Sequence, residues 1–312
     1  MVVNDINTQR ERTRFSLARI LKLYGITKSS YYSWFDENGQ LRQPVQRGPV
    51  NTGVLPEEIQ RVLVYRNEHR DVGYRKLTWM MNDADVAYLS ESSVYHILSA
   101  HKMLYGWDSA DNTDTEKEYK HKPQYVHHHW HTDIAYIKIR DNYYFLIMVL
   151  DGYSRFLLGW ELMTDMLSSS VQMFVQRVKE KYPNARPMLI NDNGSQFISN
   201  DFKGLITRLQ IHQVFTRRNH PQTNGKIERM NKTVKDEAIR VKRPESYQEA
   251  IDILQEYEYI YNYQRLHAGI KFVRPADVFF DRQEDILRAR KEKIQRARME
   301  RIIHNNGRKF VA

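Results

Sequence analysis

Three strand-like stretches follow one another between positions 130 and 163, and this succession restricts the fold more than any other feature of the chain. The first two candidates, 130–139 and 143–151, are separated only by Arg140-Asp141-Asn142. The third covers 155–163. Strands joined by connections this short pair as antiparallel neighbours, so the sequence predicts a meander at the start of a sheet.

The pattern then changes to alternating helices and strands. We expect a helix at 168–182, a buried strand at 187–191, a helix at 198–210, a strand at 211–216, a loop at 217–224 and helices at 225–241 and 246–264. A meander followed by such alternation favours an α/β fold, with a mixed sheet and helices on its faces.

Helices dominate the part of the chain that precedes position 125. Residues 12–36 predict two short helices around a turn, with Gly25 suited to a left-handed cap and Thr27 to an N-cap. Three further helices are expected near 56–69, 73–83 and 90–103. Both groups fit helix-turn-helix units, and the last helix would be the one that reads a DNA groove.

The predicted organisation has six parts. They are a helix-turn-helix-like DNA-binding segment (1–40), a linker (41–55), a second helix-turn-helix-like domain (56–105), a linker (106–124), the α/β catalytic core (125–280) and a basic helical tail (281–312).

Charge and composition favour a nucleic-acid partner. The chain of 312 residues has a formal net charge of +10 and a pI near 9.5, which suits a polyanion. It contains no cysteine, which excludes disulfides, thiolate zinc sites and cysteine nucleophiles. No signal pattern opens the sequence, and the longest apolar run, 143–150, is too short to span a bilayer. We therefore expect a cytoplasmic protein with no membrane partner.

Three acidic residues occupy positions that suit a metal-dependent nuclease. Asp133 lies in the first strand candidate, Asp192 follows the apolar run 187–190, and Glu228 opens a helix, with 35 residues between the second acid and the third. Carboxylates brought together need neutralisation, which divalent cations supply. Each acid also has a structural explanation, because Asp192 could form an Asx turn and Glu228 could face the helix dipole.

The helix that carries Glu228 has two distinct faces. Ile227, Met230, Val234 and Ala238 recur at helical spacing and predict a buried stripe. A neighbouring polar stripe contains Glu228, Asn231, Lys232 and Lys235, which we interpret as one metal-binding carboxylate beside a track for DNA phosphates.

Several strings of residues resemble a known family. They are Trp130-His131-Thr132-Asp133, Leu150-Asp151-Gly152-Tyr153-Ser154-Arg155, Asn191-Asp192-Asn193-Gly194-Ser195-Gln196-Phe197, His220-Pro221-Gln222-Thr223-Asn224-Gly225-Lys226-Ile227-Glu228-Arg229, Tyr261-Asn262-Tyr263-Gln264-Arg265-Leu266-His267 and Arg274-Pro275-Ala276. With them, residues 125–280 resemble the integrase core of retroviral integrases and bacterial insertion-sequence transposases. The two helical units resemble those that precede the core in the second-reading-frame product of insertion sequences.

The resemblance implies a ribonuclease-H-like fold with a mixed five-stranded sheet. In that fold Asp133 would lie on the first strand, Asp192 just past the adjacent fourth strand, and Glu228 on a helix that reaches over them. These three acids would be both the catalytic residues and the ligands of two Mg²⁺ ions, with Mn²⁺ as a substitute. The implied activity is that of a transposase acting on double-stranded DNA, both element ends and target, as a homo-oligomer in the bacterial nucleoid.

Departures from the family affect the expected partners. The cysteine-containing zinc module of retroviral integrases is absent, and so is the leucine-zipper segment of fused insertion-sequence transposases. A separate DNA-binding partner protein is therefore a further expectation.

Basic and amide side chains near the expected DNA path complete the predicted site. The DNA-binding candidates are Lys28, Arg75, Lys76, Arg217, Arg218, His220, Asn224, Lys226, Asn231, Lys232 and Lys235. Asp151 is predicted to shape the turn after the second strand rather than to bind metal.

Two other functions remain open at the level of sequence. His129 and His131 share a strand face, as in nucleases that pair two histidines with a catalytic tyrosine, and the histidine cluster 127–131 could also bind zinc. The non-enzymatic alternative is a DNA-binding regulator derived from a transposase.

Overall fold

The structure, a computed structural model, describes residues 2–35, 40–41, 53–104, 122–216 and 224–307. The chain divides into two compact units, residues 1–51 and residues 52–312. Each unit is built around its own buried apolar side chains.

The smaller unit consists of three helices around one small core. They are α1 (Val2–Thr13), α2 (Leu17–Leu23) and α3 (Lys28–Tyr32). Gly25 ends α2 in the left-handed region with a φ of +67°, and the Thr27 hydroxyl accepts a hydrogen bond from the Ser30 amide. The two predicted helices and both caps are confirmed, whereas α1 was not predicted.

A second group of helices opens the larger unit, and we call residues 53–104 the helical segment. It contains α4 (Pro56–Glu68), α5 (Tyr74–Asp83) and α6 (Glu91–Ala100). Val62, Leu77, Met81 and Leu98 are buried in its core. Ser90 caps α6 by accepting from the Ser93 amide.

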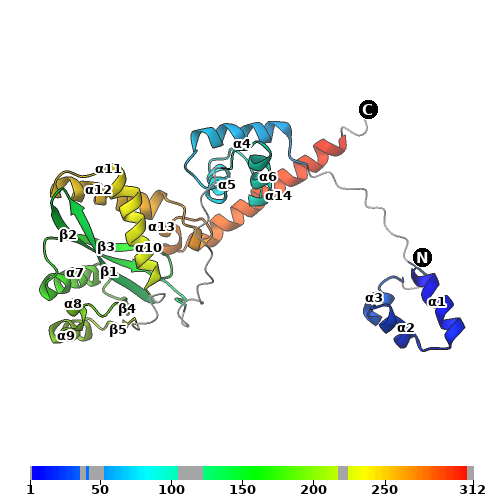
Figure 1. The fold of residues 1–312 in the computed structure, drawn as a ribbon, viewed down its shortest axis with the longest axis horizontal. Coiled ribbons are helices and arrows are strands. Elements are labelled where there is room, and N and C mark those ends of the chain that lie inside the picture. Colours follow the sequence, from blue (N-terminus) through cyan, green and yellow to red (C-terminus); the bar gives the residue numbers. More distant parts are fainter. Residues whose placement is uncertain (1, 36–39, 42–52, 105–121, 217–223, 308–312) are drawn as a thin grey trace. The chain divides into compact units, whose positions relative to one another are not determined.

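A five-stranded mixed sheet forms the centre of the larger unit (Figure 1). Its strands are β1 (His129–Ile139), β2 (Asn142–Asp151), β3 (Leu157–Met163), β4 (Met188–Asn191) and β5 (His212–Phe215), in the spatial order β3-β2-β1-β4-β5. The first three strands pair antiparallel, and β1–β4 and β4–β5 pair parallel. This is the ribonuclease-H-like arrangement, and the predicted fold is confirmed.

Helices cover both faces of the sheet. One face packs on α7 (Ser168–Lys181), α8 (Ser195–Ile198) and α9 (Asn200–Arg208). The other packs on α10 (Gly225–Val234), the π-helical turn η2 (Lys235–Ile239), α12 (Tyr247–Tyr259) and a second π-helical turn, η3 (Ile260–Gln264), and the short helix α11 (Arg240–Lys242) follows η2 without buried residues. Successive side chains of β1 and β2 therefore point to opposite faces of the sheet and pack in two separate apolar cores.

The remaining elements are η4 (Ala268–Ile270), α13 (Pro275–Phe279) and the long helix α14 (Gln283–Gly307). Ile286 and Leu287 pack α14 against Ile270, Val273 and Val278. Farther along, Arg290 and Arg301 of the same helix bond to the helical segment. Of the helices assigned in the described ranges, none is long and apolar enough to cross a membrane.

Candidate active site

Two of the predicted acids are brought together by the pairing of parallel strands. In the register of β1 and β4, His131 lies opposite Ile190. Two residues farther along, Asp133 on β1 therefore corresponds to Asp192, which follows the last residue of β4. The Asp192 carboxylate accepts a hydrogen bond from the Gly194 amide at 3.1 Å, so it also forms the Asx turn that the sequence allows.

Helix α10 carries the third acid to the same strand. Asn224 at its start donates to the Thr132 carbonyl at 3.2 Å, and Asn231 donates to Oδ2 of Asp133 at 2.8 Å. Glu228 lies four residues after the first amide and three before the second, a spacing that places all three on one helix face. Two amide bonds to β1 thus flank Glu228.

The apolar side of α10 fixes this orientation. Ile227, Met230, Val234 and Ala238 are all buried, as the sequence predicts. They pack in the core that also contains β-strand residues such as Ile137 and Met148. Because the apolar stripe is anchored, the neighbouring stripe with Glu228 keeps a constant direction along the helix.

The pKa of Asp133 reflects its burial and the charges of the other two acids. Burial, together with the negative charges of Asp192 and Glu228, raises the pKa of Asp133 to about 6. The Ile134 amide and Asn231 oppose this rise by bonding to the carboxylate. Burial also raises the pKa of Glu228. A carboxylate that feels two like charges stabilises a cation placed among them.

The donor set fits a hard divalent cation, because all three groups are carboxylates and their charges repel one another. Within the ranges that the structure describes, no group of three or more His, Cys, Asp or Glu side chains lies close enough to hold a metal ion. The three carboxylates are therefore neighbours rather than a closed set of ligands.

The sheet and the helix after it are similar to a known domain family. Residues 123–221 match a family described as Integrase core domain, and residues 209–275 match a second family of the same description. The sheet and the helix that carries Glu228 thus lie in regions that match an integrase core domain, and the chain is similar to insertion-sequence transposases. The two matched regions together contain Asp133, Asp192 and Glu228, so we call residues 123–275 the integrase core.

Curated relatives match a little under half of the chain. The transposase for insertion sequence element IS904 of Lactococcus lactis is 27% identical over 150 residues, covering 47% of this chain and 59% of the relative. An uncharacterized 31 kDa protein of insertion element IS600 from Shigella sonnei is 24% identical over 152 residues, 47% of this chain and 55% of the relative. The chain thus spans little more than half the length of these relatives.

Among solved structures, the chain is similar to a simian T-cell lymphotropic virus intasome in complex with PP2A regulatory subunit B56 gamma. The TM-score is 0.46 and the sequence identity 16%, with 70% of this chain and 74% of that chain covered.

The two amides predicted to contact DNA have a different role in the structure. Asn224 and Asn231 are 3% and 8% exposed, and both donate to β1. Their side chains therefore face the sheet rather than solvent. The helical period correctly placed Asn231 beside Glu228, but it could not show that this stripe faces the first strand.

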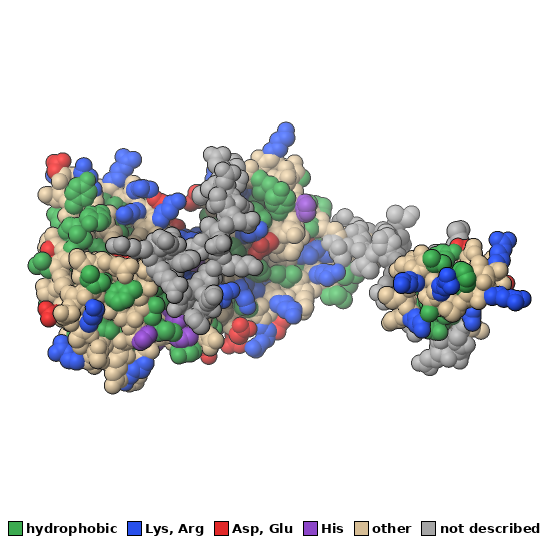
Figure 2. Space-filling model, turned by 60° about the horizontal axis from the view of Figure 1, so that its bottom comes forward, with side chains coloured by type: hydrophobic (Ala, Val, Ile, Leu, Met, Phe, Trp, Pro, Cys, Tyr) green, Lys and Arg blue, Asp and Glu red, His purple; other side chains and the backbone are tan. Residues whose placement is uncertain are grey.

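The basic candidates are distributed over several elements. Lys28 on α3 and Lys232 on α10 are exposed, and Lys226 and Lys235 are half-buried. Arg217, Arg218 and His220 lie outside the described residues. On the face shown in Figure 2, basic side chains are spread among acidic and apolar ones rather than gathered in one patch.

Two basic candidates in the helical segment differ in their surroundings. Arg75 is exposed, with Glu91 at 3.7 Å. Lys76 is half-buried, and burial together with the nearby charge of Arg265 lowers its pKa, while Glu237 opposes the shift. Arg75 is thus open to a phosphate, whereas Lys76 faces the integrase core.

The histidine alternative finds no support in the geometry. His129 and His131 are 1% and 2% exposed, and burial holds the pKa of His131 well below its usual range. Asp151, as predicted, shapes a turn: it accepts from the Ser154 amide and hydroxyl and from the His127 amide. His129 and His131 are thus part of the protein interior, whereas His127 and His128 are half-buried.

Two polar side chains that bind neighbouring elements were not predicted from the sequence. The Asn262 side chain donates to the Leu157 carbonyl at 3.0 Å and accepts from the Leu157 amide at 2.8 Å, so it binds the start of β3 as a strand would. Arg265 forms a two-pronged bond to Glu237 of η2, which also accepts from Tyr257. Asn262 and Arg265 both lie in the string 261–267, and the resemblance of that string to the integrase family was the one sequence signal that pointed to them.

Proposed function

We propose that this protein is a DNA transposase that cuts element ends and joins the freed 3′-OH groups to target DNA. In the first step, water attacks the phosphorus at the element end, the P–O3′ bond breaks, and the 3′ oxygen leaves as a hydroxyl. In the second step, that hydroxyl attacks a target phosphorus and displaces the target's 3′ oxygen. The number of phosphodiester bonds is conserved in the second step, so no ATP is required.

The observation that carries this proposal is the convergence of Asp133, Asp192 and Glu228 within an integrase core. They come from β1, from the turn after β4 and from α10, and burial together with the charges of the other two raises the pKa of Asp133. Three acids that are brought from distant parts of the sequence to where they influence one another serve no evident purpose in stability, because interacting like charges oppose folding.

Two Mg²⁺ ions, or Mn²⁺ in their place, would be held by these three carboxylates and would supply charge neutralisation and Lewis acidity at the phosphate oxygens. The protein's own contribution is orientation. Asn231 holds the Asp133 carboxylate by its Oδ2, and Asn224 holds the start of α10 on β1, so that Glu228 is directed toward Asp133.

Basic residues would bind the DNA backbone on either side of the acids. Lys232 and Lys235 follow Glu228 along α10 and η2, and Arg75 and Lys28 are exposed on the helical units. Arg217, Arg218, His220 and Lys226 complete the proposed set. A protein that acts on two element ends and a target would function as an oligomer bridging them, with a separate DNA-binding protein as a possible aid.

The test is metal-dependent nicking of the DNA ends that flank the gene, taken as imperfect inverted repeats. We expect a single cut that frees a 3′-OH in Mg²⁺ or Mn²⁺ and no cut after chelation with EDTA, whereas DNA binding persists in both. Ca²⁺ serves as the matched control ion, since it binds carboxylates but supports little phosphoryl chemistry.

The alternative function is a DNA-binding regulator without catalysis. Binding without cleavage in every metal, with purified partner protein present, would support the regulator and contradict the transposase. Cleavage that continues in EDTA would contradict the role of the carboxylates.

The Asn231 bond to Asp133 leads to a further prediction. Asn231→Ala removes the donor that orients the carboxylate, so we expect metal affinity and cleavage rate to fall about 10- to 100-fold. Thr233→Ala is the matched control, because the Thr233 hydroxyl bonds only to the Arg229 carbonyl of its own helix. Titration of Mn²⁺ against cleavage rate measures both quantities, and equal behaviour of the two variants would refute an orienting role.

A further inference from the structure

Helix α14 spans two parts of the larger unit. Near its start, Ile286 and Leu287 pack against the apolar cluster of Ile270, Val273 and Val278 beside the integrase core. From Arg290 to Asn305 it lies along the helical segment, 53–104, with bonds to Asp83, Glu58 and the Gly53 carbonyl. One straight helix therefore connects the two parts.

The basic residues of α14 face acids of the helical segment. Between 282 and 309 the sequence has ten Lys or Arg against four Asp or Glu, which on sequence alone suggested a tail for DNA. In the structure, Arg290 pairs with Asp83, Lys293 with Asp85 and Arg301 with Glu58. Three of the basic residues thus bind acids of the helical segment, and Arg282 and Arg288 pair with Asp277 and Asp285.

The acids that receive Arg290 and Lys293 lie at an unfavourable place. Asp83 is the last residue of α5 and Asp85 follows two residues later. The carboxyl end of a helix carries partial negative charge, so acids there are destabilising unless cations neutralise them. The end of α5 is therefore a specific electrostatic docking point for two cations spaced three residues apart on another helix.

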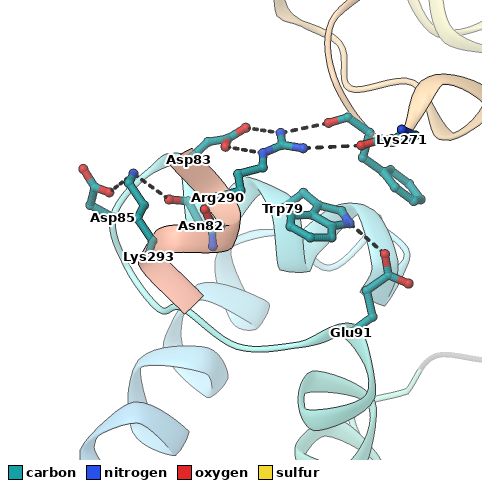
Figure 3. Close-up of polar contacts among 9 residues, drawn as sticks. Trp79, Asn82, Asp83, Asp85, Glu91, Lys271, Arg290 and Lys293 are labelled. Atoms are coloured by element: carbon teal, nitrogen blue, oxygen red, sulfur yellow. Dashed lines mark hydrogen bonds and ion pairs between the residues drawn. The ribbon is translucent and has the colours of Figure 1, made fainter. Parts of the chain in front are cut away.

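Arg290 lies at the joint between the helical segment and the integrase core and binds residues of both (Figure 3). The side chain is 3% exposed, and its Nε and Nη2 donate to the two Asp83 oxygens at 2.8 and 2.6 Å. The same Nη2 donates to the Phe272 carbonyl at 2.9 Å, and Nη1 donates to the Lys271 carbonyl at 3.4 Å. Its guanidinium also lies over the Trp79 ring, with Cζ 5.0 Å from the centroid.

The turn that offers these carbonyls has an uncommon backbone. Lys271 and Phe272 are consecutive non-glycine residues in the left-handed region, with φ of 63° and 55°. Such conformations persist where the surroundings hold them. Here both carbonyls accept from one buried guanidinium, whose planar set of donors can bind a carboxylate and two carbonyls at once.

We propose that α14 is a strut that fixes the helical segment on the integrase core, with Arg290 as the positioning residue at the joint. DNA held by the helical segment then reaches Asp133, Asp192 and Glu228 at one fixed distance. The mechanical part of this inference stands by itself, whereas the statement about DNA rests on the proposed function.

The first experiment measures the distance between the helical segment and the integrase core, and it does not depend on catalysis. The chain has no cysteine, so Ser99→Cys on α6 and Lys203→Cys on α9, both exposed, give two unique sites for spin labels in the full-length protein. We expect one narrow distance distribution in the parent protein and a broad one after Arg290→Ala. Arg288→Ala is the matched control, because Arg288 is exposed and pairs only with Asp285 on its own helix.

Two further variants separate positioning from loss of fold. Asp83→Asn keeps Arg290 on the carbonyls and should broaden the distribution less than Arg290→Ala. Arg290→Lys keeps the charge but cannot bind Asp83 and both carbonyls together, so it should restore the narrow distribution only in part. Far-UV circular dichroism of each variant reports the fold. Unchanged distributions in a folded Arg290→Ala protein would overturn the strut.

The second experiment tests the consequence for DNA. Cleavage of a long end duplex, which reaches the helical segment, is compared with cleavage of a short one that covers only the core. Arg290→Ala should raise KM for the long duplex by about tenfold, the scale of coupling between two sites. The kcat on the short duplex should stay within about twofold, because the carboxylates are untouched. If the ratio of KM for the long duplex to KM for the short duplex is the same in Arg290→Ala as in the parent protein, the proposed role of α14 in presenting DNA is overturned.

The two experiments can refute the strut and the proposed function independently of each other. If the parent protein cleaves no DNA in any metal, the proposed function fails, and the label distances still decide whether α14 is a strut. If the distances broaden while the KM ratio is unchanged, the strut stands and its role in presenting DNA is refuted.

Discussion

Asp192→Asn should abolish most end cleavage and strand transfer, with a fall in rate of at least about a hundred- to a thousandfold, while DNA binding changes little. The substitution removes one of three negative charges and leaves the shape of the side chain. The Gly194 amide, which donates to Asp192 at 3.1 Å, can donate equally to the amide oxygen of asparagine. The turn after β4 should therefore survive, and the loss should be chemical rather than structural.

Asp201→Asn is the matched control for this variant. Asp201 is an exposed acid in the first turn of α9, so its substitution changes the net charge by the same amount. We expect its cleavage rate to remain near that of the parent protein. Retention of strand transfer by Asp192→Asn would contradict the proposed mechanism with three carboxylates.

The same variant has a readout that requires no DNA. The negative charge of Asp192 is among the causes that raise the pKa of Asp133 to about 6. Removing a like charge stabilises the ionised form, so the pKa of Asp133 should fall in Asp192→Asn, although burial keeps it above its usual value. NMR titration of the Asp133 carboxyl carbon measures this shift, and an unchanged pKa would mean that the two acids do not interact.

The sequence predicted the fold well because its signals are local. The strand candidates 130–139 and 143–151 differ from β1 and β2 by one residue at one end. Side-chain alternation along a strand and the apolar stripe of Ile227 and Val234 depend only on neighbours within a few residues. Such patterns identify each element and its buried face without knowledge of what lies opposite.

The partners of polar side chains could not be predicted in the same way. Asn231 bonds to Asp133 and Arg290 bonds to Asp83, contacts between residues 98 and 207 positions apart. A helical period shows which residues share a face but not which element faces them. We therefore assigned Asn231 to DNA and interpreted the basic stretch with Arg290 as a tail, and in both cases the structure provides an internal partner.

Departures from regular helix were also invisible in the sequence. The helix predicted at 225–241 contains the π-helical turn η2, and the one predicted at 246–264 ends in η3. These turns hold Glu237, which binds Arg265, and Asn262, which binds β3. Turns of this kind shift the direction of the following side chains, and they occur often near functional sites. Helix α1 was not predicted for another reason, because its surface is mostly polar and, among its described side chains, Val3 and Ile6 alone enter the core of the smaller unit.

The largest effect on stability is expected from the ion pair between Arg301 and Glu58. Both residues are 6% exposed, and Nε of Arg301 donates to the two Glu58 oxygens at 3.1 and 2.9 Å. Glu58 also accepts from the Leu55 amide at 3.0 Å and so caps α4. Arg301→Met keeps the apolar stem but leaves a buried carboxylate without its cation, which costs about 3–5 kcal/mol.

Hydrogen exchange at the α4 amides is the suitable measurement, because a chain with two compact units has no single free energy of unfolding. Since 1.4 kcal/mol is a factor of ten, protection of α4 should fall by roughly a hundred- to several-thousandfold in Arg301→Met. Arg298→Met, an exposed arginine on the same helix, should leave the protection within about twofold.

A double variant decides whether this loss comes from the orphaned charge. Glu58→Gln combined with Arg301→Met removes both charges and keeps an oxygen that can accept from the Leu55 amide, so α4 stays capped. Replacing a buried ion pair by neutral groups is often close to neutral in stability, whereas removing one partner is not. The double variant should therefore recover most of the lost protection. If it is as unprotected as Arg301→Met, the packing of the arginine stem, and not the buried carboxylate, holds α14 to α4.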